Sequence, residues 1–387
     1  SPQDASAHSN LGVTLKELGR LDEAEASYKQ ALALKPNDVE PHNNLGNLFK
    51  EQGRFDEAQA SYKQAIALKP DFAEAHDSLA FVLKELGELE EAEANYKQAI
   101  ALKPNYAQAH YNMGIMLKER GELGKAKAIY KQAIALKPDF PEAHNNLATV
   151  LKELGELEES VASYRQSIAF QPEHADAHYN LGVTLKELGK LDEAVASHKQ
   201  ALALKPDYAL AHFNLGATLQ ELGRLEEAQA SFMLAIPLKP DFSQAHDHLL
   251  QCLYLLDKRT LFFDELDSLI NQDMANAVIG SLTIRSALKY GLEKPNLFCR
   301  EPLKYVSHID LNAQYDFEEI LVKKAKSILN EEKISNRKQP LLVSGYQTSG
   351  NLFDIEKDAT GEIQKAIRLE IEKYRINFKN SEEGFLK

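Results

Sequence analysis

One 34-residue segment, first seen at residues 5–38, occurs seven times in succession and ends at Phe242. The copies align glycines at one position and prolines at another. These columns are Gly19, Gly53, Gly87, Gly121, Gly155, Gly189 and Gly223, and Pro36, Pro70, Pro104, Pro138, Pro172, Pro206 and Pro240. A fixed period of this length indicates stacked units, because one unit cannot bury its apolar face without its neighbours.

Each unit is predicted to be a helical hairpin. Apolar residues recur at i, i+4 and i+7 from Leu11 and at i, i+3, i+7 and i+10 from Leu21, and both spacings give one apolar helix face. Gly19 is expected to end the first helix in a left-handed conformation, and Pro36 to end the second because it cannot donate to a continuing helix. Pro237 is expected to end the last second helix early.

The starts of the first helices carry residue pairs spaced as in a capping box, where a side chain accepts from the first-turn backbone. These pairs are Asp71 and Glu74, Asn105 and Gln108, and Asp139 and Glu142. A column of small residues that contains Gly12, and another that contains Ala24, are expected to let the two helices approach closely.

The repeat resembles the tetratricopeptide repeat. The matching columns begin with Leu11, Gly12, Ala24, Tyr28, Ala31 and Pro36. The resemblance implies a right-handed superhelix whose concave inner face is made mostly by the first helices. Repeats four to seven depart from the pattern at Gly124, Ser160, His198 and Pro237.

The predicted organisation is an all-α solenoid followed by part of an α+β segment. Residues 1–4 are a lead-in, residues 5–242 the seven repeats, and residues 243–258 a capping helix, after which the chain leaves the repeat. Residues 259–337 form a helical linker region with helices at 261–270, 277–290 and 317–329. Residues 338–387 begin a second module, with a short strand at 341–343, a Gly-rich turn at 344–350 and an amphipathic helix at 362–378.

That second module resembles the start of a bacterial 2-oxoglutarate and Fe(II)-dependent oxygenase module. The resemblance rests on GYQTSGNLFD at 345–354, IQKAIRLEIEKYRINF at 363–378 and SEEGF at 381–385. In that family the metal ligands lie further along, and no histidine follows His308 here. We therefore expect no cofactor and no oxygenase activity in this chain, while a longer parent could use Fe(II) and 2-oxoglutarate.

The amino-acid composition limits which classes of partner the protein can bind and where in the cell it is expected. A net charge of −13 argues against nucleic acid or an anionic membrane, because both require a basic surface. No apolar run is long enough to cross a bilayer. Only two cysteines, Cys252 and Cys299, and no signal peptide indicate a cytoplasmic protein.

The candidate binding residues form rows along the predicted inner face. An asparagine row resembles the peptide-holding ladder of O-linked N-acetylglucosamine transferase, and an amide can pair with any peptide backbone. The alternative is that these amides bond neighbouring helices. The row comprises Asn10, Asn44, Asn112, Asn146, Asn180 and Asn214.

Two further rows accompany the asparagines. Lys118 and Lys152 belong to a lysine row that either borders the groove or forms an ordinary solvated Lys–Glu surface. Tyr111, Tyr179 and Phe213 would supply aromatic anchors for side-chain specificity.

Eight histidines also share one column, from His8 to His246. A metal array is excluded because equivalent first helices should be separated by a second helix, and zinc needs nitrogens at about 2 Å. These histidines are interpreted as packing residues, and no metal site is predicted.

The favoured hypothesis is a scaffold that binds an extended peptide or protein segment on its concave face. The alternative is a substrate-recruiting arm of an oxygenase whose catalytic core lies beyond Lys387. A weaker alternative is the targeting arm of a glycosyltransferase.

Overall fold

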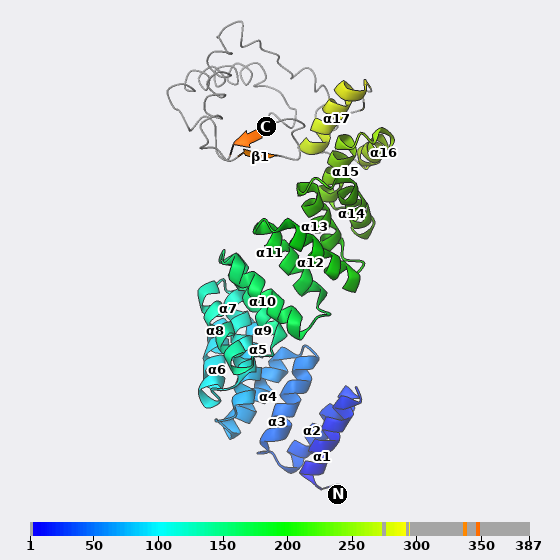
Figure 1. The fold of residues 1–387 in the computed structure, drawn as a ribbon. Helices are drawn as coiled ribbons and strands as arrows, with labels where there is room; N and C mark the ends of the chain where they lie inside the picture. Colours follow the sequence, from blue (N-terminus) through cyan, green and yellow to red (C-terminus); the bar gives the residue numbers. More distant parts are fainter. Residues whose placement is uncertain (1–2, 273–275, 292–293, 295–335, 339–345, 349–387) are drawn as a thin grey trace, which may run out of the picture. The chain divides into compact units, whose positions relative to one another are not determined.

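The computed structural model describes residues 3–272, 276–291, 294, 336–338 and 346–348. The chain divides into two compact units, Ser1–Gly189 and Lys190–Lys387. Figure 1 shows that the helices within each unit follow one another as antiparallel hairpins. The all-helical solenoid predicted from the repeats is confirmed for this part of the chain.

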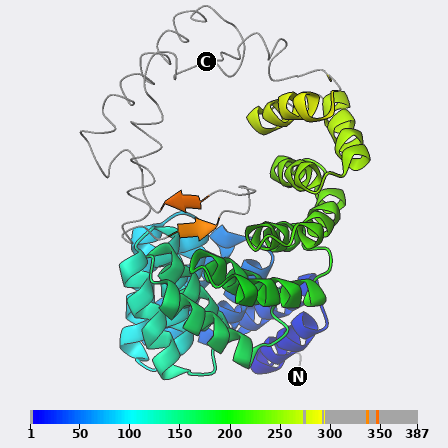
Figure 2. The same cartoon turned by 45° about the horizontal axis from the view of Figure 1, so that its top comes forward.

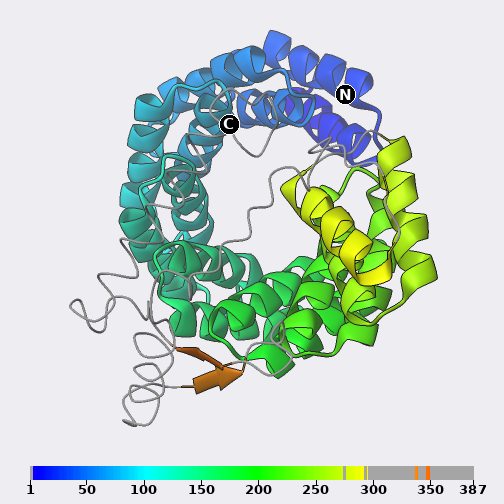
Figure 3. The ribbon, with the colours of Figure 1, turned by 90° about the horizontal axis from the view of Figure 1, so that it is seen from above.

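The first unit consists of eleven helices, stacked hairpin on hairpin (Figures 2 and 3, blue to green). They are α1 Ala5–Glu17, α2 Leu21–Leu34, α3 Val39–Glu51, α4 Phe55–Leu68, α5 Ala73–Glu85, α6 Leu89–Leu102, α7 Ala107–Glu119, α8 Leu123–Leu136, α9 Pro141–Glu153, α10 Leu157–Phe170 and α11 Ala175–Glu187.

The second unit contains six described helices and two short strands. They are α12 Leu191–Leu204, α13 Ala209–Glu221, α14 Leu225–Leu238, α15 Ser243–Leu255, α16 Arg259–Asn271, α17 Ala277–Tyr290, β1 Asn336–Lys338 and β2 Tyr346–Thr348. The strands pair antiparallel, with Asn336 opposite Thr348 and Lys338 opposite Tyr346.

The turn inside each hairpin is a Schellman motif. Gly19 has φ 74°, its N–H donates to the Lys16 carbonyl at 2.9 Å, and the Arg20 N–H donates to the Leu15 carbonyl at 2.9 Å. All seven column glycines have positive φ, a conformation that a Cβ disfavours. The predicted roles of Gly19 and Pro36 are confirmed, since α2 ends at Leu34.

The predicted capping boxes are wrong. Helices α5, α7 and α9 take Phe72, Tyr106 and Phe140 as N-caps, and none has a side-chain cap hydrogen bond. A capping box would require Asp71, Asn105 and Asp139 as the N-caps, but each helix has the following residue as its N-cap. The aromatic N-cap instead lies under the preceding lysine, as in Lys103 Nζ at 4.6 Å from the Tyr106 ring centroid.

The interior of a hairpin is set by a tyrosine against a small residue. Tyr28 is 1% exposed, and a Cβ added to Gly12 would lie 2.6 Å from its Cε1 atom. The same distance holds between Gly114 and Tyr130. The small-residue column therefore exists because the second helix inserts a ring where the first helix has no side chain.

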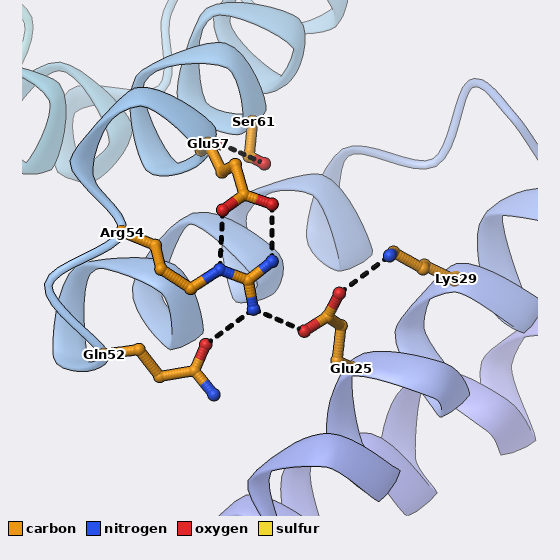
Figure 4. A network of polar contacts seen from close by, with 6 residues as sticks. All are labelled: Glu25, Lys29, Gln52, Arg54, Glu57 and Ser61. Carbon is orange, nitrogen blue, oxygen red and sulfur yellow. Dashed lines mark hydrogen bonds and ion pairs between the residues drawn. The ribbon is translucent and has the colours of Figure 1, made fainter.

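Neighbouring even helices are tied by ion pairs, of which the Arg54 network is the clearest (Figure 4). From the start of α4, the Arg54 guanidinium donates to Glu57 through Nε at 2.6 Å and to Glu25 of α2 through Nη1 at 2.7 Å. Glu25 also pairs with Lys29 at 2.7 Å. The hydrogen bond from Arg54 lowers the pKa of Glu25. Such half-exposed pairs fix register more than they stabilise.

The repeat geometry continues past Phe242, contrary to the sequence interpretation. The predicted capping helix, α15, is the first helix of an eighth hairpin with α16, and α17 begins 34 residues after α15. Asp257 and Gly291 occupy the glycine column, with φ 57° and 66°.

The eighth hairpin could not be recognised from the sequence because its large side chains stand at different positions of the repeat. Leu250 stands where Gly216 does one repeat earlier, Leu266 replaces the ring of Phe232, and Phe262 replaces the small Ala228. All three substituted residues are fully buried. The space between the two helices is thus filled by a different set of side chains, whose summed volume exceeds that of Gly216, Ala228 and Phe232.

Two local expectations also fail. Pro237 does not shorten α14, which has the same 14 residues as α12, because a proline in the last turn loses only one late backbone donor. Tyr346–Thr348 forms a strand inside the predicted Gly-rich turn. The other expectations for residues 295–387, including the strand at 341–343, the helices at 317–329 and 362–378 and the oxygenase resemblance, lie outside the described residues.

A volume-swap series tests the packing rule. Gly114→Leu should lower the free energy of unfolding by about 1–3 kcal/mol because the new side chain collides with Tyr130. Adding Tyr130→Leu and Ala126→Phe copies the eighth hairpin and should recover most of that loss.

Urea unfolding followed by circular dichroism measures the series. Gly124→Leu is the control, because that glycine lies in α8 with open space around it, and it should stabilise slightly. A triple variant less stable than Gly114→Leu alone would contradict the rule.

Candidate functional site

The odd-numbered helices contact one another directly, which the sequence analysis did not expect. In residues 1–189, side chains 35 positions apart bond across consecutive odd helices: Asn112 Nδ2 donates to Asp77 Oδ1 at 3.0 Å, and Asn146 Nδ2 donates to the Tyr111 hydroxyl at 3.1 Å. We call this side of α1, α3, α5, α7, α9 and α11 the odd-helix face. It carries the predicted asparagine and lysine rows.

The asparagine row divides into two kinds of residue. Asn112 and Asn146 donate hydrogen bonds to the preceding odd helix, as expected if the row joins neighbouring helices. The Asn112 Oδ1 atom also accepts from Gln108 at 2.9 Å. Asn44 and Asn180 are half-buried, and their amides make no hydrogen bond to another described residue. Only Asn44 and Asn180 therefore keep both the donor and the acceptor of the side-chain amide for a ligand.

The ends of the row differ again. Asn10 is exposed on the first helix, and its backbone carbonyl accepts from Thr14. Asn214 lies in the second unit and donates to the Leu210 carbonyl at 3.0 Å. The row is therefore not a uniform ladder.

The predicted aromatic anchors are largely engaged in packing. The Tyr111 ring lies 4.8 Å from Phe140 and 6.0 Å from Tyr130, between centroids. Phe213, in the second unit, lies 4.7 Å from Phe242. Tyr179 is half-buried on α11. Tyr111 and Phe213 thus fill the space between consecutive hairpins.

The lysine row is partly neutralised. Lys152 pairs with Glu187 of the next odd helix at 3.0 Å, whereas Lys118 is half-buried and forms no ion pair with a described residue. The sequence analysis missed Phe81, a half-buried ring with Lys50 Nζ and Lys84 Nζ each 5.5 Å from its centroid. The available signal was that Phe81 is the one aromatic in its column of seven repeats.

Family models identify the repeats. One described as a TPR repeat matches residues 14–53, 46–87, 82–119, 114–155, 149–189 and 184–223, and one described as a tetratricopeptide repeat matches residues 209–242. The chain belongs to the tetratricopeptide repeat family. Members of this family act as scaffolds for protein–protein interactions.

The chain is similar to several solved structures. YrrB, described as a TPR protein with an unusual peptide-binding site, is 25% identical with a TM-score of 0.44, and the match covers 48% of this chain and 95% of YrrB. PilF of Pseudomonas aeruginosa is 20% identical, with a TM-score of 0.48 and coverages of 52% and 92%. PilW, described as a widely conserved type IV pilus biogenesis factor, is 24% identical, with a TM-score of 0.49 and coverages of 56% and 98%. No curated protein matches the chain.

The histidine column of this tetratricopeptide repeat protein closes the loop between repeats. Nε2 of each histidine from His42 onward lies 2.9–3.4 Å from the carbonyl oxygen of the column proline six residues earlier. A carbonyl only accepts, so Nε2 carries the proton. These nitrogens are already used, which gives a better reason against a metal array than the separation of helices that the sequence suggested. Among the described residues no group of three His, Cys, Asp or Glu could hold a metal ion.

His246 has a second partner. Its Nδ1 contacts the Glu265 carboxylate of α16, and this hydrogen bond raises the pKa of His246. The equivalent contact in repeat three joins His76 Nδ1 and the neutral Asn95 side chain at 2.9 Å. The position on the second helix that faces Nδ1 of the loop histidine is thus an acid in one repeat and a neutral amide in another.

A buried acid lies on the odd-helix face. Asp77 is 6% exposed, and burial raises the pKa of its carboxyl, opposed by the hydrogen bond from Asn112 and by the charge of Lys50. Tyr106 also donates to Asp77 Oδ2 at 3.4 Å. Desolvation in the same region lowers the pKa of Lys50. A buried charge kept at this cost is typical of functional surfaces.

No described helix combines the length and the apolar character that a membrane crossing demands.

Asp77→Asn should stabilise the protein at pH 7. A raised pKa means that the folded state holds the proton more tightly than the unfolded chain, so the ionised carboxylate costs stability as pH rises above its unfolded pKa. The gain of the variant should shrink as pH falls from 7 toward 4. Urea midpoints across this range test it, with the exposed Asp71→Asn as control. A less stable variant at pH 7 would show that the carboxylate is net stabilising.

Glu265→Gln should weaken the eighth hairpin at pH 6 and have little effect at pH 9. The raised pKa of His246 contributes stability below the unfolded pKa, and this contribution is lost as pH rises through the folded value. Amide hydrogen exchange of α15 and α16 reports this local stability.

The matched gain-of-charge variant is Asn95→Asp, which faces His76 with a carboxylate. It should stabilise repeat three at pH 6 more than at pH 9. Equal effects of either variant at both pH values would contradict the charge argument.

Proposed function

We propose that the odd-helix face of residues 1–189 binds an extended segment of a partner protein through the segment's backbone. The observation that carries the proposal is the pair of half-buried amides, Asn44 and Asn180, without a partner among the described residues. An amide offers a donor and an acceptor, as a peptide bond requires. Membership of a family of interaction scaffolds agrees with this function.

The surface around these amides suits a peptide. Phe81 presents a half-buried ring on the same face, between two lysine ammonium groups. Aromatic rings in partly desolvated settings contribute strongly to binding. Phe81 therefore replaces Tyr111 and Phe213 as the expected apolar anchor, since those two rings pack against the rings of Phe140 and Phe242, whereas Phe81 contacts no other aromatic ring among the described residues.

The remaining hypotheses lie elsewhere in the chain. The oxygenase arm, with Fe(II) and 2-oxoglutarate, and the glycosyltransferase arm depend on residues outside the described part or beyond Lys387. The exclusion of nucleic acid and the cytoplasmic location stay predictions from composition and sequence.

Binding to the full chain can be measured with a displayed library of random 12-residue peptides, followed by fluorescence anisotropy of enriched members. Asn44→Ala and Asn180→Ala should each weaken binding by about 5- to 10-fold, as expected for the loss of one or two hydrogen bonds of about 0.5–1.5 kcal/mol each. Their stability should remain near wild type, because neither amide bonds another described residue.

Two controls separate binding from folding. Asn37→Ala removes the same amide from an exposed loop and should leave affinity unchanged. Asn112→Ala should lower stability, because it breaks the bond to Asp77. Absence of any enriched peptide, or unchanged affinity in the Asn44 and Asn180 double variant, would overturn the proposal.

A further inference from the structure

From Lys16 to Lys152, the lysines of the odd-helix face alternate between those with and those without an ion pair to a described residue. Three of them pair with a glutamate of the next odd helix: Lys16 with Glu51 at 2.5 Å, Lys84 with Glu119 at 3.2 Å, and Lys152 with Glu187 at 3.0 Å. Lys50 and Lys118, which lie between them in the row, form no ion pair with a described residue. The acid next to Lys50 and the acid 35 residues after it are both paired with other lysines, because Glu51 pairs with Lys16 and Glu85 with Lys84.

The surroundings of Lys50 leave its charge poorly compensated. It is half-buried beside the Phe81 ring, at 5.5 Å from the centroid, and is partly removed from water. Asp77 attracts it, but the carboxylate oxygens of Asp77 already accept from Asn112 and Tyr106. A desolvated ammonium gains free energy when an anion reaches it.

Lys118 is the equivalent residue two repeats later. It is half-buried on α7, and no described acid lies within ion-pair distance. Its neighbour Glu119 is held by Lys84. Lys50 and Lys118 are therefore two unneutralised cations in equivalent positions on one face.

The spacing of the two lysines sets the spacing of a ligand. Consecutive odd helices contact each other, and packed helices lie about 8–10 Å apart, so the step from α3 to α7 is roughly 20 Å. An extended peptide advances about 3.3 Å per residue, which corresponds to about six residues.

We propose that the odd-helix face selects extended segments with two acidic side chains about six residues apart, one bound by Lys50 and one by Lys118. The inference rests on the proposed peptide binding and adds its specificity. Lys84, between the two sites, is neutralised by Glu85 and Glu119 and does not serve as a third. Phe81 packs against the ligand beside the first acid.

The test uses the full chain and fluorescent 12-residue peptides with a common Ser, Thr and Val background. Two glutamates stand three, six or nine residues apart, and a matched peptide replaces both with glutamine. The six-residue spacing should bind about tenfold or more tightly than the glutamine peptide and best of the three, and the gain should decline with added salt.

Protein variants locate the effect. Lys50→Gln and Lys118→Gln should each remove most of the preference for the acidic peptide, whereas Lys63→Gln and Lys131→Gln, on even helices, should retain it. In a double cycle, Lys50→Gln should cancel the benefit of one glutamate only.

The outcomes separate the two proposals. If glutamine peptides bind as tightly as acidic ones, yet Asn44→Ala weakens both, acidic selection is overturned and backbone binding stands. An equal loss of preference in Lys63→Gln would also overturn it, because a lysine outside the odd-helix face would then act like Lys50 and Lys118. If no peptide binds, both proposals fall.

Discussion

The close contact between a ring and a small residue in the earlier hairpins is the constraint on which the rest of the structure depends. Tyr28 occupies the space above Gly12, and the same pair recurs through the repeats. It fixes the separation of the two helices and hence the position at which the next hairpin stacks. In the eighth hairpin, Leu250, Phe262 and Leu266 fill the space with large side chains at all three positions. The fold requires a filled interface between the two helices, not one fixed set of residues.

Polar side chains then fix the neighbouring hairpins in register. On the even helices this is done by exposed ion pairs such as the Arg54 network, and in the loops by a histidine that donates to a proline carbonyl. A proline carbonyl at a helix end has no intrahelical partner, so the histidine satisfies a group that the helix break leaves open. The repeated histidine is thus a consequence of the repeated proline.

The odd-helix face shows how one row of residues serves two purposes. Asn112 and Asn146 form hydrogen bonds between helices, while the side-chain amides of Asn44 and Asn180 bond no other described residue. The lysines show a similar division, because a glutamate of the next odd helix neutralises Lys84, whereas no described acid forms an ion pair with Lys118. A nearly identical repeat can therefore carry local binding specificity through small differences in which partners are already satisfied.

The sequence by itself determined the hairpins, their register and their stacking, because the period of 34 residues and the glycine, tyrosine and proline columns encode local geometry and burial. It also indicated which rows share a face. Only the tertiary structure decided that Tyr111 packs against Phe140, that Asn112 bonds Asp77, and that the repeat continues through α16. These facts depend on contacts between residues about 30 positions apart. The identity of the neighbouring residue decides whether a polar or aromatic side chain already has a partner within the protein. Periodicity places a side chain on a face, but only packing shows what it touches there.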